Sequence, residues 1–181
     1  SEVSRFESLF SKYVGTKFAV GLSNGTCSLH LSLKTLGLQP GDEIITPPIT
    51  FIATQATAAL MGAKIVFADI QEDTGNLDYE HVESLITKKT KAIVAVDYAG
   101  HPADLDELKK ITEKHNIYLI EDAAHSLGSK YRNRSVGSIA DLTTFSFFPT
   151  KNITTGEGGA ISSTNPELLK RAKRFGRQGL I

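Results

Sequence analysis

Residues 91–126 read KAIVAVDYAGHPADLDELKKITEKHNIYLIEDAAHS and contain the pattern that decides the fold. The runs Ala92–Asp97 and Ile117–Glu121 are short, apolar and rich in β-branched residues, which is typical of buried strands. Between them, Leu105–His115 has the pattern of a helix. Because parallel strands need a long crossover connection, this segment predicts a strand–helix–strand unit of a parallel sheet.

The same alternation extends in both directions along the chain. Further buried parallel strands are expected at Phe18–Leu22, Glu43–Thr46, Lys64–Ala68, Leu142–Phe147 and Gly159–Ser163. Further helices are expected at Cys27–Leu36, Ile52–Met61, Asp78–Ile86 and Pro166–Phe175. Asp78 is expected in the first turn of its helix, where the helix dipole favours a negative charge. The predicted fold class is a three-layer α/β/α domain with a mostly parallel sheet. Ligands bind such folds at the carboxyl ends of the strands.

The composition is that of an ordinary globular protein of 181 residues, with 20 basic and 20 acidic side chains and a formal net charge of zero. This balance argues against a nucleic-acid binder that relies on bulk electrostatics. No apolar run approaches the roughly 20 residues of a membrane span, and no signal peptide is visible. The single cysteine, Cys27, excludes an internal disulfide framework and a Cys-rich zinc site. We expect a cytoplasmic domain, cut at both ends, without a metal, membrane or nucleic-acid partner.

The first candidate segment is SNGTCS (23–28), which follows a strand and opens a helix. Gly25 permits a tight turn, and the free amide groups at the start of a helix suit an anion. Thr26 adds a hydroxyl donor. The alternative is an ordinary helix cap, with Ser23, Asn24 or Thr26 as the capping side chain. Neither G-x-G-x-x-G nor G-x-x-x-x-G-K-[ST] occurs, which disfavours a dinucleotide site and a P-loop.

The second candidate segment is EDAAHS (121–126), after the strand Ile117–Glu121. The small residues leave room for a flat ligand, and Asp122 could hold a positive charge or a protonated ring nitrogen. For an isolated aspartate the alternative is a helix cap, and His125 could be a partly buried structural histidine.

The third candidate is Lys151, the only lysine in the aromatic and glycine-rich segment 144–159, which follows a strand. Desolvation lowers the pKa of an amine and makes it a nucleophile that can form a Schiff base. The alternative is a surface turn lysine.

The fourth candidate is Phe51, which follows the strand Glu43–Thr46 and could stack on a planar ligand. Core packing is the alternative for this residue. Taken together, the four segments supply an anion cradle, an aromatic plate, a buried acid and an isolated lysine at strand ends. Pyridoxal phosphate requires these parts from a protein.

The sequence resembles the DegT/DnrJ/EryC1/StrS family of sugar aminotransferases from about Phe6 to Gly179. The motifs that carry the resemblance match in order and spacing, and are SNGTCSLHLSL (23–33), GDEIITPPITFIAT (41–54), DYAGHPADLDEL (97–108), EDAAHSLGS (121–129), FSFFPTKNITTGEGG (145–159) and NPELLKRAKRFGRQG (165–179). The resemblance implies the aspartate-aminotransferase-like fold of type I pyridoxal phosphate enzymes. The chain would be its cofactor-binding large domain, without the N-terminal arm and the small C-terminal domain of the family.

The resemblance also assigns residues. Lys151 is similar to the lysine that carries the cofactor and moves protons, and Asp122 to the acid paired with the pyridine nitrogen. Phosphate contacts are implied for Thr26, the Cys27 backbone and Ser146. The resemblance further implies ring stacking for Phe51 and a place near the ring substituents for His125.

The family resemblance implies an activity and partners. Its members transfer an amino group, usually from L-glutamate, to a keto group of a nucleotide-linked deoxysugar through pyridoxamine phosphate. Their site lies at a homodimer interface. Some members are dehydratases with histidine in place of the lysine, so Lys151 favours transamination. Two alternatives are a non-catalytic module that binds pyridoxal phosphate and a plain α/β binding domain without a Schiff base.

Overall fold

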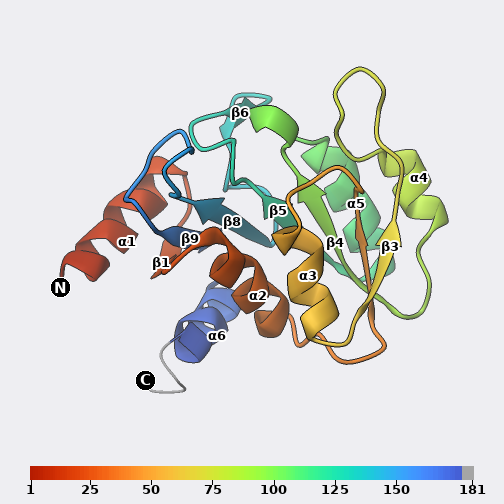
Figure 1. Ribbon diagram of the computed structural model, residues 1–181, viewed down its shortest axis with the longest axis horizontal. Helices are drawn as coiled ribbons and strands as arrows, with labels where there is room; N and C mark the ends of the chain where they lie inside the picture. The colour runs from red at the N-terminus through yellow and green to blue at the C-terminus, as the bar shows by residue number, and fades with distance from the viewer. Residues whose placement is uncertain (177–181) are drawn as a thin grey trace.

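The structure is a computed structural model that describes residues 1–176. Its centre is a seven-stranded sheet with the order β1-β9-β8-β5-β4-β2-β3 (Figure 1). The strands are β1 (Phe18–Leu22), β2 (Glu43–Thr46), β3 (Lys64–Phe67), β4 (Thr90–Val96), β5 (Tyr118–Asp122), β8 (Leu142–Ser146) and β9 (Gly159–Ser163). All the strands expected from the sequence are therefore present in this sheet, with bounds close to those predicted.

One strand runs in the direction opposite to the one predicted. The sequence favoured a parallel strand at β9, but β9 pairs antiparallel with both β8 and β1. The reason lies in the connection, because the chain between Ser146 and Gly159 contains no helix. Without a crossover helix the chain turns back and runs beside β8 as its antiparallel neighbour. The remaining pairs, from β8 across to β3, are parallel.

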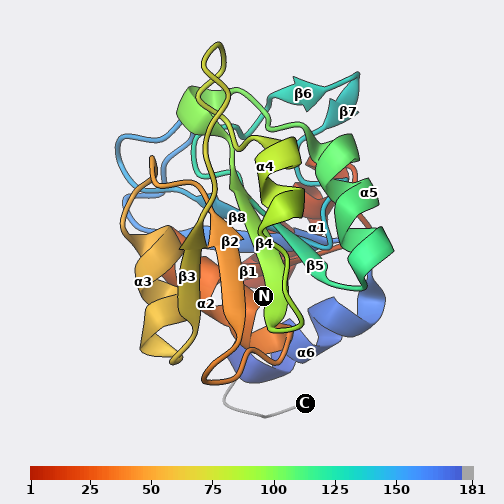
Figure 2. The same ribbon diagram turned by 90° about the vertical axis from the view of Figure 1, so that its right-hand side faces the viewer.

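Helices cover both faces of the sheet, as the alternation predicted (Figure 2). They are α1 (Glu2–Tyr13), α2 (Gly25–Thr35), α3 (Ala53–Leu60), α4 (Tyr79–Ser84), α5 (Leu105–His115) and α6 (Pro166–Gly176). Helices α2, α3 and α6 share one apolar core. On the other face, α4 and α5 enclose a second core and α1 a third. The three-layer α/β/α fold is thus confirmed.

Helix α1 was not predicted from the sequence. Ser1 caps it, since the Ser1 hydroxyl accepts a hydrogen bond from the Ser4 amide at 3.3 Å. Its buried side chain Phe10 lies 5.4 Å from Phe6, ring centre to ring centre, and makes an edge contact with Phe145 of β8. The spacing of Phe6 and Phe10, one helical turn apart, is the sequence signal that indicates this helix.

Three smaller expectations also change. Strand β3 is not buried, because it lies at the sheet edge with β2 as its only neighbour strand, and Phe67 is exposed. Asp78 precedes the first turn of α4 and is its N-cap, where its carboxylate accepts hydrogen bonds from the amides of Glu80 and His81. A short hairpin, β6 (Lys130–Tyr131) with β7 (Arg134–Ser135), follows β5 and was not foreseen.

No helix within residues 1–176 has the length and apolar character required to cross a membrane. The last residues of the family resemblance, 177–179, lie outside the described part of the chain. The strands β2, β4, β5 and β8 end at one edge of the sheet. Three of the four candidate segments follow strands at this edge, and the fourth begins helix α2 beside it.

Candidate functional site

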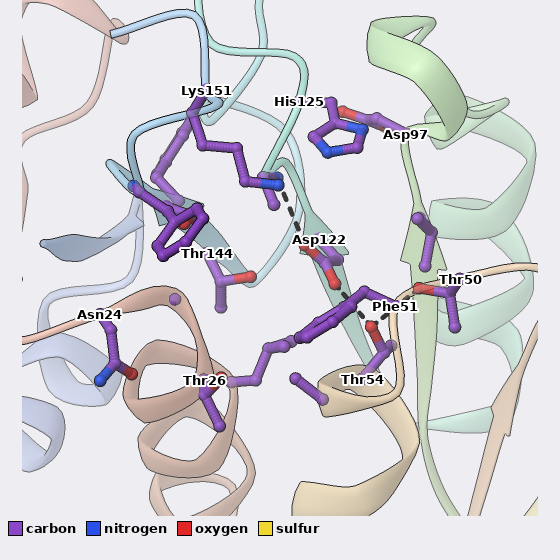
Figure 3. Close-up of a pocket in the computed structure, with 18 of the residues that line it drawn as sticks. Asn24, Thr26, Thr50, Phe51, Thr54, Asp97, Asp122, His125, Thr144 and Lys151 are labelled. Atoms are coloured by element: carbon purple, nitrogen blue, oxygen red, sulfur yellow. Dashed lines mark hydrogen bonds between the residues drawn. The ribbon is translucent and has the colours of Figure 1, made fainter. Parts of the chain in front are cut away.

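A cavity of about 770 Å³ opens at the carboxyl ends of the parallel strands. Six of the seven candidate residues line it, and Figure 3 shows most of them: Thr26, Phe51, Asp122, His125, Ser146 and Lys151. The seventh, Cys27, does not line the cavity. The side chains come from segments far apart in the sequence, so only the fold brings them together.

The start of α2 forms one wall of the cavity. Asn24 is its N-cap, and the Asn24 Oδ1 atom accepts a hydrogen bond from the Cys27 amide at 2.8 Å. Of the three capping residues that the sequence left open, the structure therefore selects Asn24. The Cys27 amide is engaged in the cap, and the Cys27 Sγ atom accepts a hydrogen bond from Ser23 Oγ at 3.3 Å. Thr26, in the first turn, faces the cavity.

Two glycines allow this helix start to approach the sheet. A Cβ atom on Gly25 would lie 2.8 Å from the Cβ atom of Ser146, and one on Gly159 would lie 2.4 Å from the Asn24 carbonyl oxygen. Any side chain at either position would push α2 away from β8 and β9. The sequence predicted a tight turn at Gly25 and indicated no role for Gly159, although a glycine in a strand often marks such a close approach.

Asp122 ends β5 and lies at the floor of the cavity, with 6% of its surface exposed. Its Oδ2 atom accepts a hydrogen bond from Thr54 Oγ1 at 2.8 Å, and its Oδ1 atom accepts one from the Ala124 amide at 3.3 Å. Burial raises the pKa of Asp122, while these hydrogen bonds and the positive charge of Lys151 oppose the rise. Asp122 is therefore a buried acid whose two carboxylate oxygens both accept hydrogen bonds and which lies close to the amine of Lys151.

Lys151 lies in the turn after β8, and its side chain extends into the cavity (Figure 3). Burial lowers the pKa of the Lys151 amine, and the negative charge of Asp122 opposes the shift. A lower pKa increases the share of neutral amine, the form that attacks a carbonyl group. The sequence left open a desolvated amine and a surface turn lysine, and the partly buried position of Lys151 in the cavity favours the desolvated amine.

His125 and Phe51 complete the candidate set. Burial lowers the pKa of His125, and the charge of Lys151 lowers it further against the opposing effect of Asp122. The His125 ring therefore gives up its proton more readily than a histidine in water. Phe51 keeps 75% of its surface exposed at the cavity, so its ring is free to contact a ligand and is not core packing.

Several lining residues were not predicted. Thr50 and Thr54 flank Phe51, and their hydroxyl oxygens lie 2.9 Å apart. Ala99, in the loop after β4, has a left-handed backbone with φ of 51° and also lines the cavity. The motif GDEIITPPITFIAT contained both threonines, but local sequence does not show that Thr54 contacts Asp122.

A second pair of acids lies next to this floor. Asp97 and Glu121 are both buried. Burial and the charge of Glu121 raise the pKa of Asp97, and burial raises the pKa of Glu121 to about 7. Nevertheless, residues 1–176 contain no group of three or more acidic, histidine or cysteine side chains arranged to hold a metal ion.

A cleft that presents a partly desolvated lysine to a buried carboxyl, with an aromatic side chain and a helix N-terminus close by, has the donor set that pyridoxal phosphate needs. Fold and site thus define the cofactor domain of a type I pyridoxal phosphate enzyme. The chain belongs to the DegT/DnrJ/EryC1/StrS aminotransferase family, whose family profile matches residues 1–181. Pyridoxal phosphate is the cofactor of this family.

Comparison with known proteins gives the same family. The chain is 42% identical to GDP-perosamine synthase of Caulobacter vibrioides over 98% of its length and 48% of that protein. Its fold is similar to S. venezuelae DesV in complex with a ketimine intermediate, with a TM-score of 0.95, 38% identity and coverage of 99% and 49% of the two chains. DesI, solved in the presence of its TDP-sugar product, gives a TM-score of 0.94 at 37% identity, with coverage of 98% and 45%. The chain spans about half the length of the curated relatives it matches.

Proposed function

We propose that this protein is an aminotransferase that moves an amino group, with L-glutamate as the donor, to a keto group of a nucleotide-linked deoxysugar. The observation that carries the proposal is the approach of Lys151 and Asp122 within one cavity at the carboxyl ends of the strands. Relatives support the sugar substrate, since one is a GDP-perosamine synthase and another was solved with a TDP-sugar product.

Lys151 holds the cofactor covalently and transfers protons in the reaction. Because burial lowers the pKa of its amine, Lys151 is neutral more often than a solvated lysine and can take up a proton from substrate. Pyridoxal phosphate, when bound, supplies an electron sink for the negative charge that develops at the substrate carbon. Asp122 would pair with the pyridine nitrogen and keep it protonated, which is what would make the ring a sink.

The remaining candidates orient the cofactor. Thr26 and Ser146 lie at the wall where α2 meets β8, and their hydroxyls with the amides at the start of α2 bind the phosphate. The Cys27 amide belongs to this group through its place in the first turn of α2, although the Asn24 cap engages it here. Phe51 would stack on the ring, and His125 would lie near the ring substituents.

A partner subunit completes the site in this proposal. Large apolar side chains stay exposed around the cavity, with 75% of Phe51, 44% of Phe148 and 43% of Ile49 accessible. Such a patch is typical of an interaction surface, and a second copy in a cytoplasmic homodimer would cover it. The chain would be the cofactor-binding large domain of the subunit.

A second candidate is a module that binds pyridoxal phosphate without catalysis. The observation in its favour is the coverage, because the chain matches only about half the length of its relatives. Cofactor capture without amino transfer, followed by activity in a longer chain, would identify this case.

The test is to mix the protein with pyridoxal phosphate, reduce with borohydride and locate the adduct by peptide mass. An adduct confined to Lys151 is expected, and Lys151→Ala should abolish both the adduct and amino transfer from glutamate to a nucleotide-linked keto-sugar. Lys88 and Lys89, on the loop before β4, provide control positions. Adducts spread over several lysines, or wild-type turnover in the Lys151→Ala variant, would contradict the proposal.

A further inference from the structure

The inference concerns Thr54, a buried hydroxyl that the proposed mechanism does not use. Thr54 lies in the first turn of α3 and is 1% exposed. Its Oγ1 atom donates to Asp122 Oδ2 at 2.8 Å across 68 positions of sequence, and it lies 2.9 Å from Thr50 Oγ1 (Figure 3). The three side chains form a short chain of hydrogen bonds from the cavity wall to its floor.

The direction of this chain follows from counting hydrogens. A carboxylate only accepts hydrogen bonds, and a threonine hydroxyl has one hydrogen to give. Because Thr54 gives its hydrogen to Asp122, the contact between the two threonines requires Thr50 to donate to Thr54. As long as Asp122 is ionised, Thr50 therefore donates to Thr54 and Thr54 donates to Asp122. A protonated Asp122 could itself donate a hydrogen bond, and this direction of donation would then not be required.

Thr54 also fixes the segment that carries the aromatic ring. Its backbone amide donates to the carbonyl oxygen of Phe51 at 3.1 Å. One residue thus holds Phe51 through its main chain and Asp122 through its side chain. Any displacement of the start of α3 would move both together.

We propose that Thr54 is a positioning residue for the cofactor: its hydroxyl holds Asp122 as an ionised acceptor aimed at the ring nitrogen, and its amide holds the segment that places Phe51 against the ring. This inference rests on the proposed function. Thr50 supports Thr54 from the cavity wall and contributes less, because Thr54 can donate to Asp122 without it.

Other charged groups also act on Asp122. Lys151 and His125 face it across the cavity, and their positive charges lower the pKa of Asp122. Asp97 and Glu121 lie on the neighbouring part of the sheet, and the charge of Asp122 raises the pKa of both. The Thr54 hydrogen bond opposes the effect of burial more than any of these charges does.

The experiment compares Thr54→Val with Thr54→Ser in the protein at its full natural length. The dissociation constant of pyridoxal phosphate is measured, and the visible absorbance of the cofactor bound at Lys151 is followed against pH. Loss of one hydrogen bond to a charged group should weaken binding about tenfold in Thr54→Val. The pH midpoint should rise, because a ring nitrogen that is held less firmly protonated withdraws less charge from the Schiff base. Thr54→Ser should stay close to wild type, and Thr50→Val should lie between the two.

Three outcomes would overturn the inference. The first is Thr54→Val with wild-type affinity and midpoint, and the second is a Thr54→Ser variant as defective as Thr54→Val. If Thr54→Val does not fold, Thr54→Ala against Thr54→Ser gives the same contrast, because the two differ by one hydroxyl. A lower melting temperature of the cofactor-free protein with an unchanged midpoint would mean a structural role and also overturns it. Absence of a Lys151 adduct in the unaltered protein would instead contradict the proposed function itself.

Discussion

Glu121 and Asp122 are consecutive carboxyl residues on β5, but they serve opposite sides of the sheet. Successive side chains of a strand point to opposite faces. Asp122 faces the cavity and is held by Thr54 of α3, whereas Glu121 Oε2 accepts hydrogen bonds from Thr143 Oγ1 at 2.7 Å and the Gly137 amide at 3.1 Å. One acid is therefore available to a ligand, and the other belongs to the core.

The difference between the two acids lies in their surroundings. Glu121 is fully buried, and within residues 1–176 its Oε1 atom has no hydrogen-bond partner. Burial raises the pKa of Glu121 to about 7, so this acid keeps its proton at pH values where a glutamate in water has lost it. Asp122 has Lys151 and His125 nearby, and their charges favour its ionised form. Two carboxyl groups on one strand thus have different surroundings, a cavity with two basic side chains for Asp122 and a closed core for Glu121.

The largest expected effect comes from matched amide substitutions at the two positions. Asp122→Asn should reduce kcat/KM for amino transfer by roughly 100-fold or more, because an amide cannot hold the proton on the ring nitrogen. Glu121→Gln should change kcat/KM only a few-fold, since an amide can still accept from Thr143. Steady-state kinetics with both variants is the measurement. Equal losses of kcat/KM in the two variants would show that the two faces of the sheet do not differ in function.

The second prediction concerns stability against pH. A glutamate in water has a pKa of 4.5, and burial raises the pKa of Glu121 to about 7 in the folded protein. Within this window the folded state holds a proton that the unfolded chain has lost, so the free energy of unfolding falls as pH rises. The shift corresponds to about 3 kcal/mol. The raised pKa values of Asp97 and Asp122 act in the same direction, and the lowered pKa of His125 opposes them.

Urea unfolding of the cofactor-free protein across this pH window tests the prediction. Glu121→Gln should flatten the pH dependence, because the amide does not titrate. A wild-type protein whose stability stays constant from the lower to the upper end of the window would show that Glu121 is ionised in the fold.

The third prediction concerns a substitution that disturbs the cavity side of the sheet without removing a polar group. Gly159→Ala would place a Cβ atom 2.4 Å from the Asn24 carbonyl oxygen and should cost about 1–3 kcal/mol of stability. It should also weaken binding of pyridoxal phosphate, because α2 would be displaced from Ser146. Gly21→Ala on the adjacent strand β1 is the control, since its added Cβ atom would meet Phe6 at an ordinary distance of 3.5 Å. Chemical unfolding and cofactor titration of both variants give the comparison, and similar behaviour would contradict it.

The smallest expected effect is at Thr143, which donates to Glu121 from β8. Thr143→Val should lower the free energy of unfolding by about 1 kcal/mol, the usual net value of a hydrogen bond. Cofactor affinity should not change, because Thr143 lies on the core side. Thr143→Ser keeps the hydroxyl and should be closer to wild type. A loss of affinity in Thr143→Val would show that the two faces depend on each other.

Local sequence patterns predicted much of this protein. The apolar runs identified every strand of the large sheet, and the pattern Leu105–His115 matches α5. Lys151, Asp122 and Phe51 were selected because each follows a strand, and the structure brings them to one cavity. Chain connectivity explains this success, because the carboxyl ends of neighbouring parallel strands meet at one edge of a sheet.

Three features were not predicted, two because the local pattern was ambiguous or short and one because the contact joins distant segments. The direction of β9 depends on whether a crossover helix forms between Ser146 and Gly159. The aromatic, proline and glycine residues of this segment did not show whether it would be a helix or a turn. Helix α1 was missed although Phe6 and Phe10 are one turn apart, because the pattern is short. Thr54 was not selected because its partner is 68 positions away.

The sequence by itself determined which residues end up at the edge of the sheet, because strand and helix periodicities are local properties of the chain. Only the tertiary structure decided which of two adjacent acids would face the cavity. Alternation along β5 places Glu121 and Asp122 on opposite faces, but the core on one side and the cavity on the other decide how far the pKa of each acid is shifted. Burial and hydrogen bonds across the fold set the free energy of ionisation, and those exist only when the layers have packed.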